Sequence, residues 1–592
     1  MNLYATIRDH VTAALREAVP GIPDDVVTRV EVTPAKDPAH GDMATNAAMV
    51  AAKPARQAPA TIAASIAAIL ASAPEIAEAA PAGPGFVNIR LKPATLRATL
   101  PAILLAGEAY GASTVGNHAP VNVEYVSANP TGPLHVGHCR GAVVGDALAN
   151  LMQKAGFDVT KEYYVNDAGA QVQALAWAAY WRYLQAAGTA LTEDDYAAQV
   201  PGGLQYRGDY LIPVAQALHA SHGDSLAGPG ATIAASGLWL DTVRDTAIAM
   251  MLASIREDLA ALGVTPDVWT SERALVATGA PDQVIDRLTA QGLIYEGTLE
   301  PPKGKVPEDW EPREQTLFRA SQFGDDVDRP LRKSDGTNTY FANDIAYHAD
   351  KMRRSPGLMI DVWGADHGGY VSRMKSAVRA LAGGSGQSLD VVLCQIVHVL
   401  RAGQPVRMSK RAGTYVTLAD LLEWVGRDAV RFTMLTRKSD AQMEFDLDLA
   451  VAQTRDNPVW YVQYAHARCR SVLRAARDAG HDTSPTALAA VDLTPLATDA
   501  ELATTLRLAG WPRTVEAAAL AHEPHRIAFF LYDLASDFNT LWSRGNADST
   551  LRFLQADQPA ATRARLALVE AVATVIRSGL AVLGVHPMEE LR

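Results

Sequence analysis

The sequence predicts an α/β protein in which a doubly wound parallel sheet is flanked by a small α/β domain and an all-α helical bundle. Strand and helix patterns alternate between residues 121 and 171. Residues 1–112 have patterning of their own and end in a glycine- and alanine-rich linker, and almost everything after residue 458 has the period of an amphipathic helix. Alternating strands and helices build parallel sheets that bind ligands at the carboxyl ends of their strands.

Individual elements follow from the same patterns. Near the N-terminus we expect helices at residues 3–19 and 61–80 and a strand at 86–91. Further along, the patterns predict strands at 121–125, 157–165, 337–342, 358–363 and 391–400, a loop-rich insertion at about 185–240, and a long helix at 239–262.

The composition is that of an ordinary soluble globular chain, with 48% hydrophobic and 20% charged residues in 592. We expect no membrane-spanning helix and no signal peptide, because no apolar run of about 18 residues is present and the first turns are charged. The three cysteines are scattered without a CxxC pair, which argues against a disulfide framework or a cysteine-rich zinc site and favours a cytoplasmic protein. The net charge of −12 leaves nucleic-acid binding open, since local patches can differ from the sum.

The segment 121–146 is the centre of the prediction. After the strand, residues 129–133 (Asn-Pro-Thr-Gly-Pro) cannot continue a central strand, because proline lacks an N–H group. His135, Gly137 and His138 then begin a helix. The free N–H groups and dipole of a helix N-terminus attract anions, two imidazoles add donors, and the glycine lets a nucleotide approach the backbone. This stretch therefore predicts phosphate binding, with helix capping by one histidine and packing of the other as the alternative.

Two later segments supply polar groups beside the predicted sheet. Tyr340 and Asp344 follow a turn at Ser334-Asp335-Gly336; a carboxylate here suits bidentate pairing with a guanidinium, or Asp344 caps a helix at 345–351. Asp366 and His367 follow an apolar strand, where a doubly wound sheet places ligand groups; a structural role for His367 is equally open.

A basic loop and a helical stripe complete the candidates. The loop contains Met408, Ser409 and Lys410 after Arg407; a mobile cation there could neutralise a leaving pyrophosphate, whereas the alternative is a solvated basic loop. In the helix that begins near residue 458, aromatic residues alternate with arginines, a composition suited to unpaired bases and phosphates, although core packing is the commoner role of such a stripe.

Four segments in collinear order, HVGH (135–138), TYFANDIAYH (339–348), WGADHGGY (363–370) and RMSKRAG (407–413), resemble class I aminoacyl-tRNA synthetases, specifically bacterial arginyl-tRNA synthetases. The resemblance implies a tRNA-contacting N-terminal domain at 1–112, a Rossmann-like catalytic domain at 113–438 with the insertion at 185–240, and a helical anticodon-binding domain at 439–592.

The resemblance also implies a reaction and its site residues. ATP and L-arginine would form arginyl-adenylate and pyrophosphate, and the arginyl group would pass to the 3′ end of tRNA(Arg). His135, His138 and Lys410 would be catalytic. ATP would be bound by His135, Gly137, His138, Asp366, His367, Met408, Ser409 and Lys410. Arginine would be bound by Glu124, Asn129, His135, Tyr340, Asp344 and Asp366, and tRNA by Tyr461, Gln463, Tyr464, His466 and Arg468.

Mg²⁺ would arrive with ATP, with no structural metal, and the enzyme would be a cytoplasmic monomer that binds neither DNA nor membranes. Some arginyl enzymes with a poor KMSK loop carry a lysine shortly before the HIGH signature; here that position is Gly132, while the Met-Ser-Lys of the loop is intact. Two alternatives remain open: a class I synthetase for another amino acid, and a non-catalytic RNA-binding paralogue.

Overall fold

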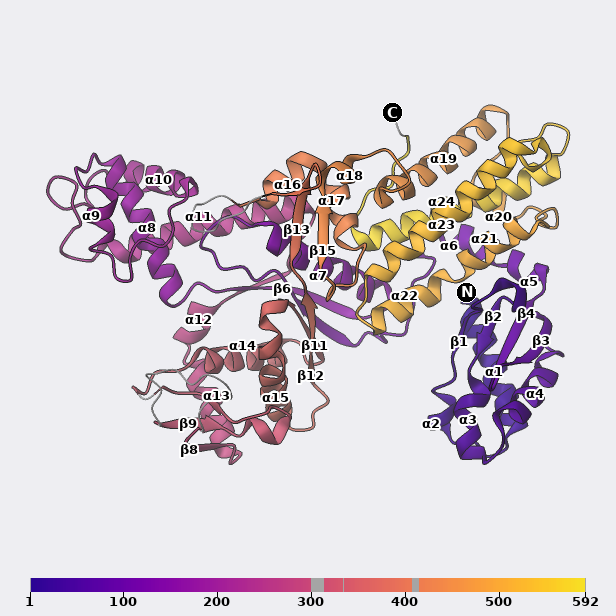
Figure 1. The fold of residues 1–592 in the computed structure, drawn as a ribbon, viewed down its shortest axis with the longest axis horizontal. Coiled ribbons are helices and arrows are strands. Elements are labelled where there is room, and N and C mark those ends of the chain that lie inside the picture. The colour runs from indigo at the N-terminus through magenta and orange to yellow at the C-terminus, as the bar shows by residue number, and fades with distance from the viewer. Residues whose placement is uncertain (1, 300–312, 334, 407–414, 591–592) are drawn as a thin grey trace. The chain divides into compact units, whose positions relative to one another are not determined.

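The computed structural model describes residues 2–299, 313–333, 335–406 and 415–590 (Figure 1). The chain divides into two compact units, one made of residues 116–451 and the other of residues 1–115 together with 452–592. The predicted basic loop, with Met408, Ser409 and Lys410, lies outside the described residues.

The first unit is built on a five-stranded parallel sheet of order β12-β11-β5-β6-β7. These strands are β5 (Pro120–Glu124), β6 (Asp158–Val165), β7 (Val268–Ser271), β11 (Leu358–Gly364) and β12 (Ser388–Cys394). The predicted doubly wound parallel architecture is confirmed. The order places β5, which precedes the HVGH segment, in the middle of the sheet, as a ligand site at the strand ends requires.

Helices connect and cover these strands. They are α7 (Val136–Lys154), α8 (Ala170–Ala186), α11 (Trp239–Leu262), α12 (Glu272–Ala277), α13 (Ala280–Ala290), α14 (Tyr340–Arg354), α15 (Val371–Ala382), α16 (Leu418–Val425), α17 (Arg427–Met434) and α18 (Leu447–Val451). Helix α15 packs against both α14 and β12 (Figure 1). Two three-stranded sheets complete the unit: β8 (Ile294–Thr298), β9 (Glu314–Phe318) and β10 (Arg329–Pro330), and β13 (Val397–Arg401), β14 (Gln404–Pro405) and β15 (Met443–Asp446).

Two strand predictions in this unit are wrong. Residues 337–342 do not form a strand, because Thr339 caps the N-terminus of α14 by accepting a hydrogen bond from the Ala342 N–H. The alternative in which Asp344 caps this helix is therefore also wrong. Residues 391–400 belong to two strands rather than one: β12 ends at Cys394, and β13 starts at Val397 in a different sheet, where it pairs with β15.

The insertion at 185–240 is more ordered than the predicted loops. It contains α9 (Glu193–Ala197) and α10 (Ile212–His222), which share a core with α8 and the start of α11. Tyr180 of α8 stacks on Trp239 of α11 at 3.6 Å between ring centroids. Aromatic packing of this kind stabilises the insertion as a folded module.

Helix α7 packs closely against β5 and the residues after it, and one glycine makes this approach possible. A Cβ atom added at Gly145 would lie 2.3 Å from Cβ and Cγ of Tyr125. We expect Gly145→Ala to destabilise the unit by about 1–3 kcal/mol, because overpacking forces the backbone or the ring to move. Gly141→Ala, on the same helix with no atom within 4 Å of its added Cβ, should instead stabilise the helix by up to about 1 kcal/mol. Thermal melts of both variants test the pair, and equal shifts would contradict the close contact.

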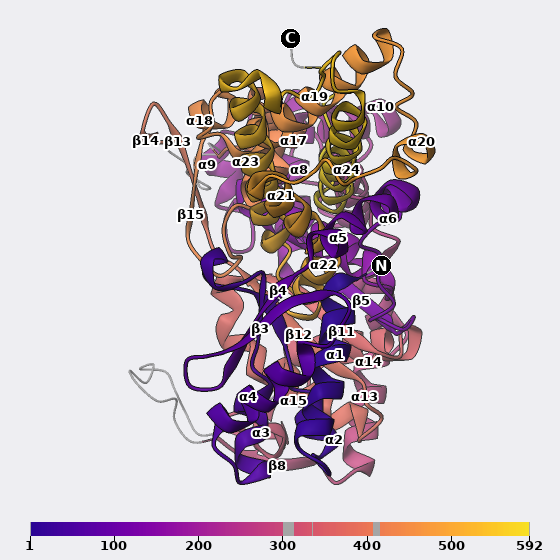
Figure 2. The same cartoon turned by 90° about the vertical axis from the view of Figure 1, so that its right-hand side faces the viewer.

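The second unit combines an antiparallel sheet with a helical bundle (Figure 2). The sheet has the order β1-β2-β4-β3, from β1 (Val32–Pro34), β2 (Met43–Thr45), β3 (Ile76–Ala82) and β4 (Phe86–Leu91). Helices α1 (Leu3–Ala18), α2 (Asp24–Val27), α3 (Ala47–Ala55), α4 (Pro59–Leu70), α5 (Pro93–Arg97) and α6 (Thr99–Ala106) belong to this N-terminal part. The predicted helix at 61–80 is partly wrong: α4 ends at Leu70, Pro74 interrupts the pattern, and the alanine-rich remainder pairs with β4.

The bundle confirms the helical prediction for the C-terminal part. It consists of α19 (Pro458–Asp478), α20 (Pro485–Ala489), α21 (Asp499–Ala509), α22 (Trp511–Leu520), α23 (His525–Ala547) and α24 (Pro559–Leu583). Helices α19, α23 and α24 pack against one another. By length and composition α24 could cross a membrane, but 89% of its most apolar window is buried inside the bundle, as in the core helix of a globular domain.

Candidate active site

The two histidines of the HVGH segment together cap α7. His135 is the N-cap residue, and its Nδ1 accepts a hydrogen bond from the Gly137 N–H at 3.0 Å. His138 Nδ1 accepts from the His135 N–H at 3.3 Å, and the two rings stack 3.8 Å apart. This reciprocal cap fixes both imidazoles at the N-terminal end of the helix, where the dipole favours an anion. The alternative of one capping and one packed histidine is thus half right, since both participate in the cap.

The chain that follows the basic loop returns directly to this helix start. The Val136 N–H donates to the Val416 carbonyl at 3.1 Å, and the Leu418 N–H donates to the Leu134 carbonyl at 2.9 Å. The ring of Tyr415 meets His135 edge-on, with 5.8 Å between centroids. Residue 415, the first described residue after 407–414, therefore lies beside His135.

Gly132 lies between two tyrosines. An added Cβ there would come within 3.3 Å of the Tyr210 ring and 3.4 Å of the Tyr415 hydroxyl. Tyr210, from the insertion, also donates its hydroxyl to the Thr131 carbonyl at 2.8 Å. The first side-chain atom of any other residue at position 132 would therefore be in tight contact with both tyrosines.

Arg140 anchors α7 to the rest of the unit. Its buried guanidinium donates to the carbonyls of Gln395 and Ala441 through Nη1, at 3.0 and 2.7 Å, and to Lys438 through Nη2 at 2.9 Å. Gln395 lies between β12 and β13, and β13 leads towards the basic loop. One side chain thus joins the HVGH helix to the residues that precede β13 and β15.

A second group of polar residues gathers around α14. Asp344 is half-buried and accepts a hydrogen bond from the Tyr370 hydroxyl at 2.6 Å. Burial raises the pKa of Asp344 to about 6; the hydrogen bond from Tyr370 and the charge of His348 lower it, and the charges of Glu272 and Glu124 raise it. Asp344 therefore lies near two buried carboxyl groups, Glu124 and Glu272, an arrangement that attracts a cation.

Tyr340 and Glu124 differ in their surroundings. Tyr340 lies one helical turn before Asp344 and is 70% exposed. Glu124, at the end of β5, is 6% exposed; it accepts from Ser127 Oγ at 2.8 Å and from Lys351 Nζ at 2.7 Å. Glu124 thus already has a cationic partner within the chain.

The remaining predicted ligands lie on turns after the strands. Asn129 donates to Gln171 Oε1 at 2.5 Å. Asp366 and His367 lie in a 3₁₀ turn (Ala365–Tyr370) after β11. Both side chains are mostly exposed, and His367 Nε2 lies 3.7 Å from Asp366 Oδ2. Across the described ranges, no group of three or more histidine, cysteine, aspartate or glutamate side chains could hold a metal ion.

Several residues of this region were missed by the sequence analysis. Tyr347, His348 and Lys351 continue the buried side of α14, and Tyr370 contacts Asp344. Tyr347, His348 and Lys351 were missed because residues 337–342 were interpreted as a strand. A helical period places these three residues and Asp344 on one side of a helix.

The predicted tRNA-binding residues lie on α19. Tyr461, Gln463 and His466 are buried; Gln463 Nε2 donates to the His586 carbonyl, and His466 Nδ1 lies 2.8 Å from the Met588 carbonyl. Arg468 stacks over Tyr464 and donates to its hydroxyl. Their predicted contacts with tRNA stay a prediction.

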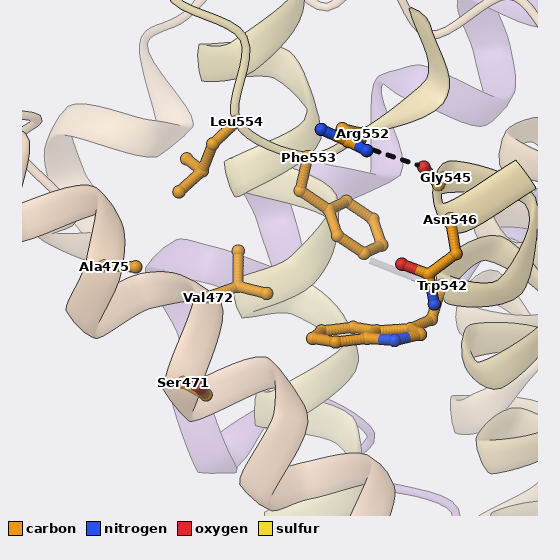
Figure 3. Close-up of a pocket in the computed structure, with 9 residues that line it drawn as sticks. All are labelled: Ser471, Val472, Ala475, Trp542, Gly545, Asn546, Arg552, Phe553 and Leu554. Atoms are coloured by element: carbon orange, nitrogen blue, oxygen red, sulfur yellow. Dashed lines mark hydrogen bonds between the residues drawn. The ribbon is translucent and has the colours of Figure 1, made fainter. Parts of the chain in front are cut away.

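One turn further along α19, the bundle contains a cavity of about 250 Å³ (Figure 3). The rings of Trp542 and Phe553 face into it, and Arg552 lies at its edge. The guanidinium of Arg468 lies 4.9 Å from the centre of the Trp542 ring. The cavity therefore combines aromatic faces with positive charge, without overlapping the five predicted residues.

Comparisons with known proteins agree with the geometry. Three family models match: the arginyl tRNA synthetase N terminal domain at residues 5–91, the class I (R) tRNA synthetase catalytic domain at 99–191, and the DALR anticodon binding domain at 462–591. The chain is 61% identical to the arginine–tRNA ligase of Gluconobacter oxydans, over all of this chain and 98% of that one, and 56% identical to that of Cereibacter sphaeroides, over the whole of both. The Thermus thermophilus arginyl-tRNA synthetase structure, 21% identical over the whole of both chains with a TM-score of 0.71, shows the same fold. The chain belongs to the arginyl-tRNA synthetase (arginine–tRNA ligase) family.

Proposed function

We propose that this chain ligates L-arginine to tRNA(Arg) with consumption of ATP. The carboxylate of arginine attacks the α-phosphorus of ATP, pyrophosphate leaves, and the arginyl group of the adenylate then passes to the 3′ end of the tRNA with release of AMP. The observation that carries the proposal is the similarity over the full length to relatives named arginine–tRNA ligase.

Arginine occupies the region between the end of β5 and the start of α14. Asp344 and Glu124 pair with the guanidinium, which has donors only and matches carboxylates in a planar fork. Tyr340 closes the side-chain end, while Asn129, His135 and Asp366 hold the amino-acid end. The burial of Glu124 and the half-buried position of Asp344 support this assignment, because a cation binds more strongly to a carboxylate that is shielded from water.

ATP binds at the start of α7, with Mg²⁺ bound to its phosphates. His135, Gly137 and His138 contact the phosphates, and Asp366 and His367 border the adenosine. Met408, Ser409 and Lys410 stabilise the leaving pyrophosphate, which is supported by the closeness of Tyr415 to His135. Catalysis is then mainly positioning and charge stabilisation, without a covalent enzyme intermediate.

The tRNA is bound by the N-terminal domain, proposed at 1–112, and by the helical domain, proposed at 439–592, which precede and follow the catalytic domain at 113–438 in the sequence. The family models for the N-terminal and anticodon binding domains support this division. On α19, exposed parts of Tyr464 and Arg468 suit unpaired nucleotides, since stacking on aromatic rings and charge attraction are the common means of binding single-stranded RNA. The enzyme acts as a cytoplasmic monomer.

The raised pKa of Asp344 predicts how arginine binding depends on pH. Only the ionised carboxylate pairs with the guanidinium, and with a pKa of about 6 the group is protonated at lower pH. The affinity for arginine should therefore be constant above pH 7 and fall by about tenfold per pH unit below pH 6. Calorimetric titration with arginine alone between pH 5 and 8 measures this, and an affinity unchanged down to pH 5 would contradict it.

Charging of tRNA(Arg) transcripts with each of the twenty amino acids tests the proposed function. We expect arginyl-tRNA alone to form. Charging with a different amino acid would replace the proposal by another class I synthetase. Binding of tRNA without any charging, by folded protein in the presence of ATP and arginine, would replace it by a non-catalytic RNA-binding role.

A further inference from the structure

Three carboxylates lie side by side across the central sheet. The register pairs Asp361 of β11 with Glu124 of β5, and Glu124 with Glu162 of β6. All three are at most 6% exposed. Neighbouring carboxylates in so little water cannot all be ionised unless cations offset them.

The cations come from α14. Lys351 is fully buried, and its Nζ donates to Glu124 Oε2 and to Asp361 Oδ1, both at 2.7 Å. Arg354 donates to both oxygens of Glu162, at 2.6 and 3.1 Å. Lys351 and Arg354 thus serve three carboxylates, and Glu124 shares Lys351 with Asp361.

The other groups around Lys351 are a tyrosine, a histidine and the carboxylates. The Tyr347 hydroxyl donates to Glu162, and the Lys351 ammonium lies over the Tyr347 ring, 4.8 Å from the ring centre. His348 Nε2 lies 2.9 Å from Asp361 Oδ2. Asp361, Glu124 and Glu162, in that order, raise the pKa of Lys351 above its usual value, although burial alone would lower it. The ammonium is accordingly charged at neutral pH.

The same helix presents Asp344 seven residues before Lys351, two turns away on the same side. One element therefore carries one of the carboxylates assigned to arginine and the counter-ion of the other. Any change in the position of α14 moves both together.

We propose that Lys351 is a specificity-determining positioning residue for arginine: it keeps the Glu124 carboxylate oriented and able to accept hydrogen bonds from the guanidinium. This inference rests on the proposed function. Without the ammonium, Glu124 and Asp361 share a proton, as adjacent carboxylates do. A protonated Glu124 carries no charge and turns one of its oxygens into a donor. It therefore pairs more weakly with the guanidinium, which has donors only.

Lys351→Met tests the proposal by calorimetric titration with arginine, and separately with ATP, between pH 6 and 9. We expect the arginine Kd to rise roughly 10- to 100-fold at pH 7 and to recover as the pH increases and the shared proton leaves. The ATP Kd should be unchanged, because the helix start that holds its phosphates is separate from this row. Lys351→Arg, which keeps the charge, should retain most of the affinity. Lys375→Met removes a lysine of α15 that is paired with Asp390 of β12, and should alter neither dissociation constant.

A double variant covers the case in which Lys351→Met does not fold. Lys351→Met with Asp361→Asn removes one positive and one negative charge. The acidic neighbour of Glu124 that remains in the row is Glu162, which keeps Arg354 as its partner. This variant should bind arginine within about tenfold of the wild type with no new pH dependence. The proposal is overturned if Lys351→Met binds arginine as the wild type does, if it binds more tightly, or if the double variant binds no arginine although it is folded. A wild-type protein that fails to bind arginine would instead refute the proposed function.

Discussion

Replacing Asp344 by asparagine should lower kcat/KM for arginine by roughly 10²- to 10³-fold, because losing one charged partner of a buried hydrogen-bonded pair costs about 2–5 kcal/mol. Asparagine keeps the shape and can still accept from Tyr370, which donates at 2.6 Å in the wild type. The change therefore removes the charge and little else. The KM for ATP should stay within a factor of about two, since the substitution lies outside the helix start that holds the phosphates. Steady-state charging of tRNA(Arg) measures both constants.

Two matched variants separate charge from packing in that experiment. Glu296→Gln neutralises an exposed carboxylate on β8 and should have no effect on either constant. Tyr370→Phe removes only the hydroxyl that bonds to Asp344, and should raise the KM for arginine by less than about tenfold. Arginine activation that survives unchanged in Asp344→Asn would show that this carboxylate is not part of the pocket.

Replacing Asp146 by asparagine should destabilise the catalytic unit by about 3–5 kcal/mol, because it leaves a buried cation without its counter-ion. Asp146, on α7, accepts from Arg431 Nη2 at 2.5 Å and from Lys161 Nζ at 2.8 Å. Arg431 is fully buried on α17 and cannot reach water. The same pair fastens the HVGH helix to α17, so ATP binding should weaken as well. Differential scanning fluorimetry and ATP titration of the variant measure the two effects.

The pH dependence of that loss has a defined sign. Burial would raise the pKa of Asp146, but Arg431 and Lys161 outweigh it, so the pKa lies below the usual 3.8. The stabilisation is then present above the usual pKa and disappears as the pH falls through the lower folded value. Asp224→Asn, which breaks an exposed contact with His219, should cost at most about 1 kcal/mol. A fall in Tm no larger than that of this control would contradict a structural role for Asp146.

The sequence predicted the architecture correctly where the hydrophobic period and the length of a segment indicated the same kind of element. Helix α11 matches its predicted bounds, and β5, β6 and β11 lie within about two residues of theirs, because alternation and helical period are both unambiguous in these stretches. The segment at 337–342 failed because its threonines and aromatics favour a strand locally, whereas the structure buries Phe341, Ala342 and Ile345 on one side of a helix. Tertiary packing decided between the two.

The candidate site was predictable only in part. Its individual residues follow from local motifs, and the structure brings Glu124 and Asp344 into one cluster. The row formed by Asp361, Glu124 and Glu162 depends on strand register between segments up to about 240 residues apart, which no local pattern contains. The RNA-binding residues of the bundle were likewise predictable only in part. The stripe of α19 that suggested RNA contacts also supplies the core of the bundle, where Tyr461 and His466 are buried.

We expect the carboxylates of Glu124 and Asp344 to select arginine through its charge. ATP–pyrophosphate exchange in the presence of tRNA(Arg), with arginine compared to citrulline, tests it most directly, because citrulline has the same length with an uncharged urea in place of the guanidinium. We expect rapid exchange with arginine and at least about a 10³-fold lower kcat/KM with citrulline. Comparable exchange with both amino acids, or none with arginine, would contradict it.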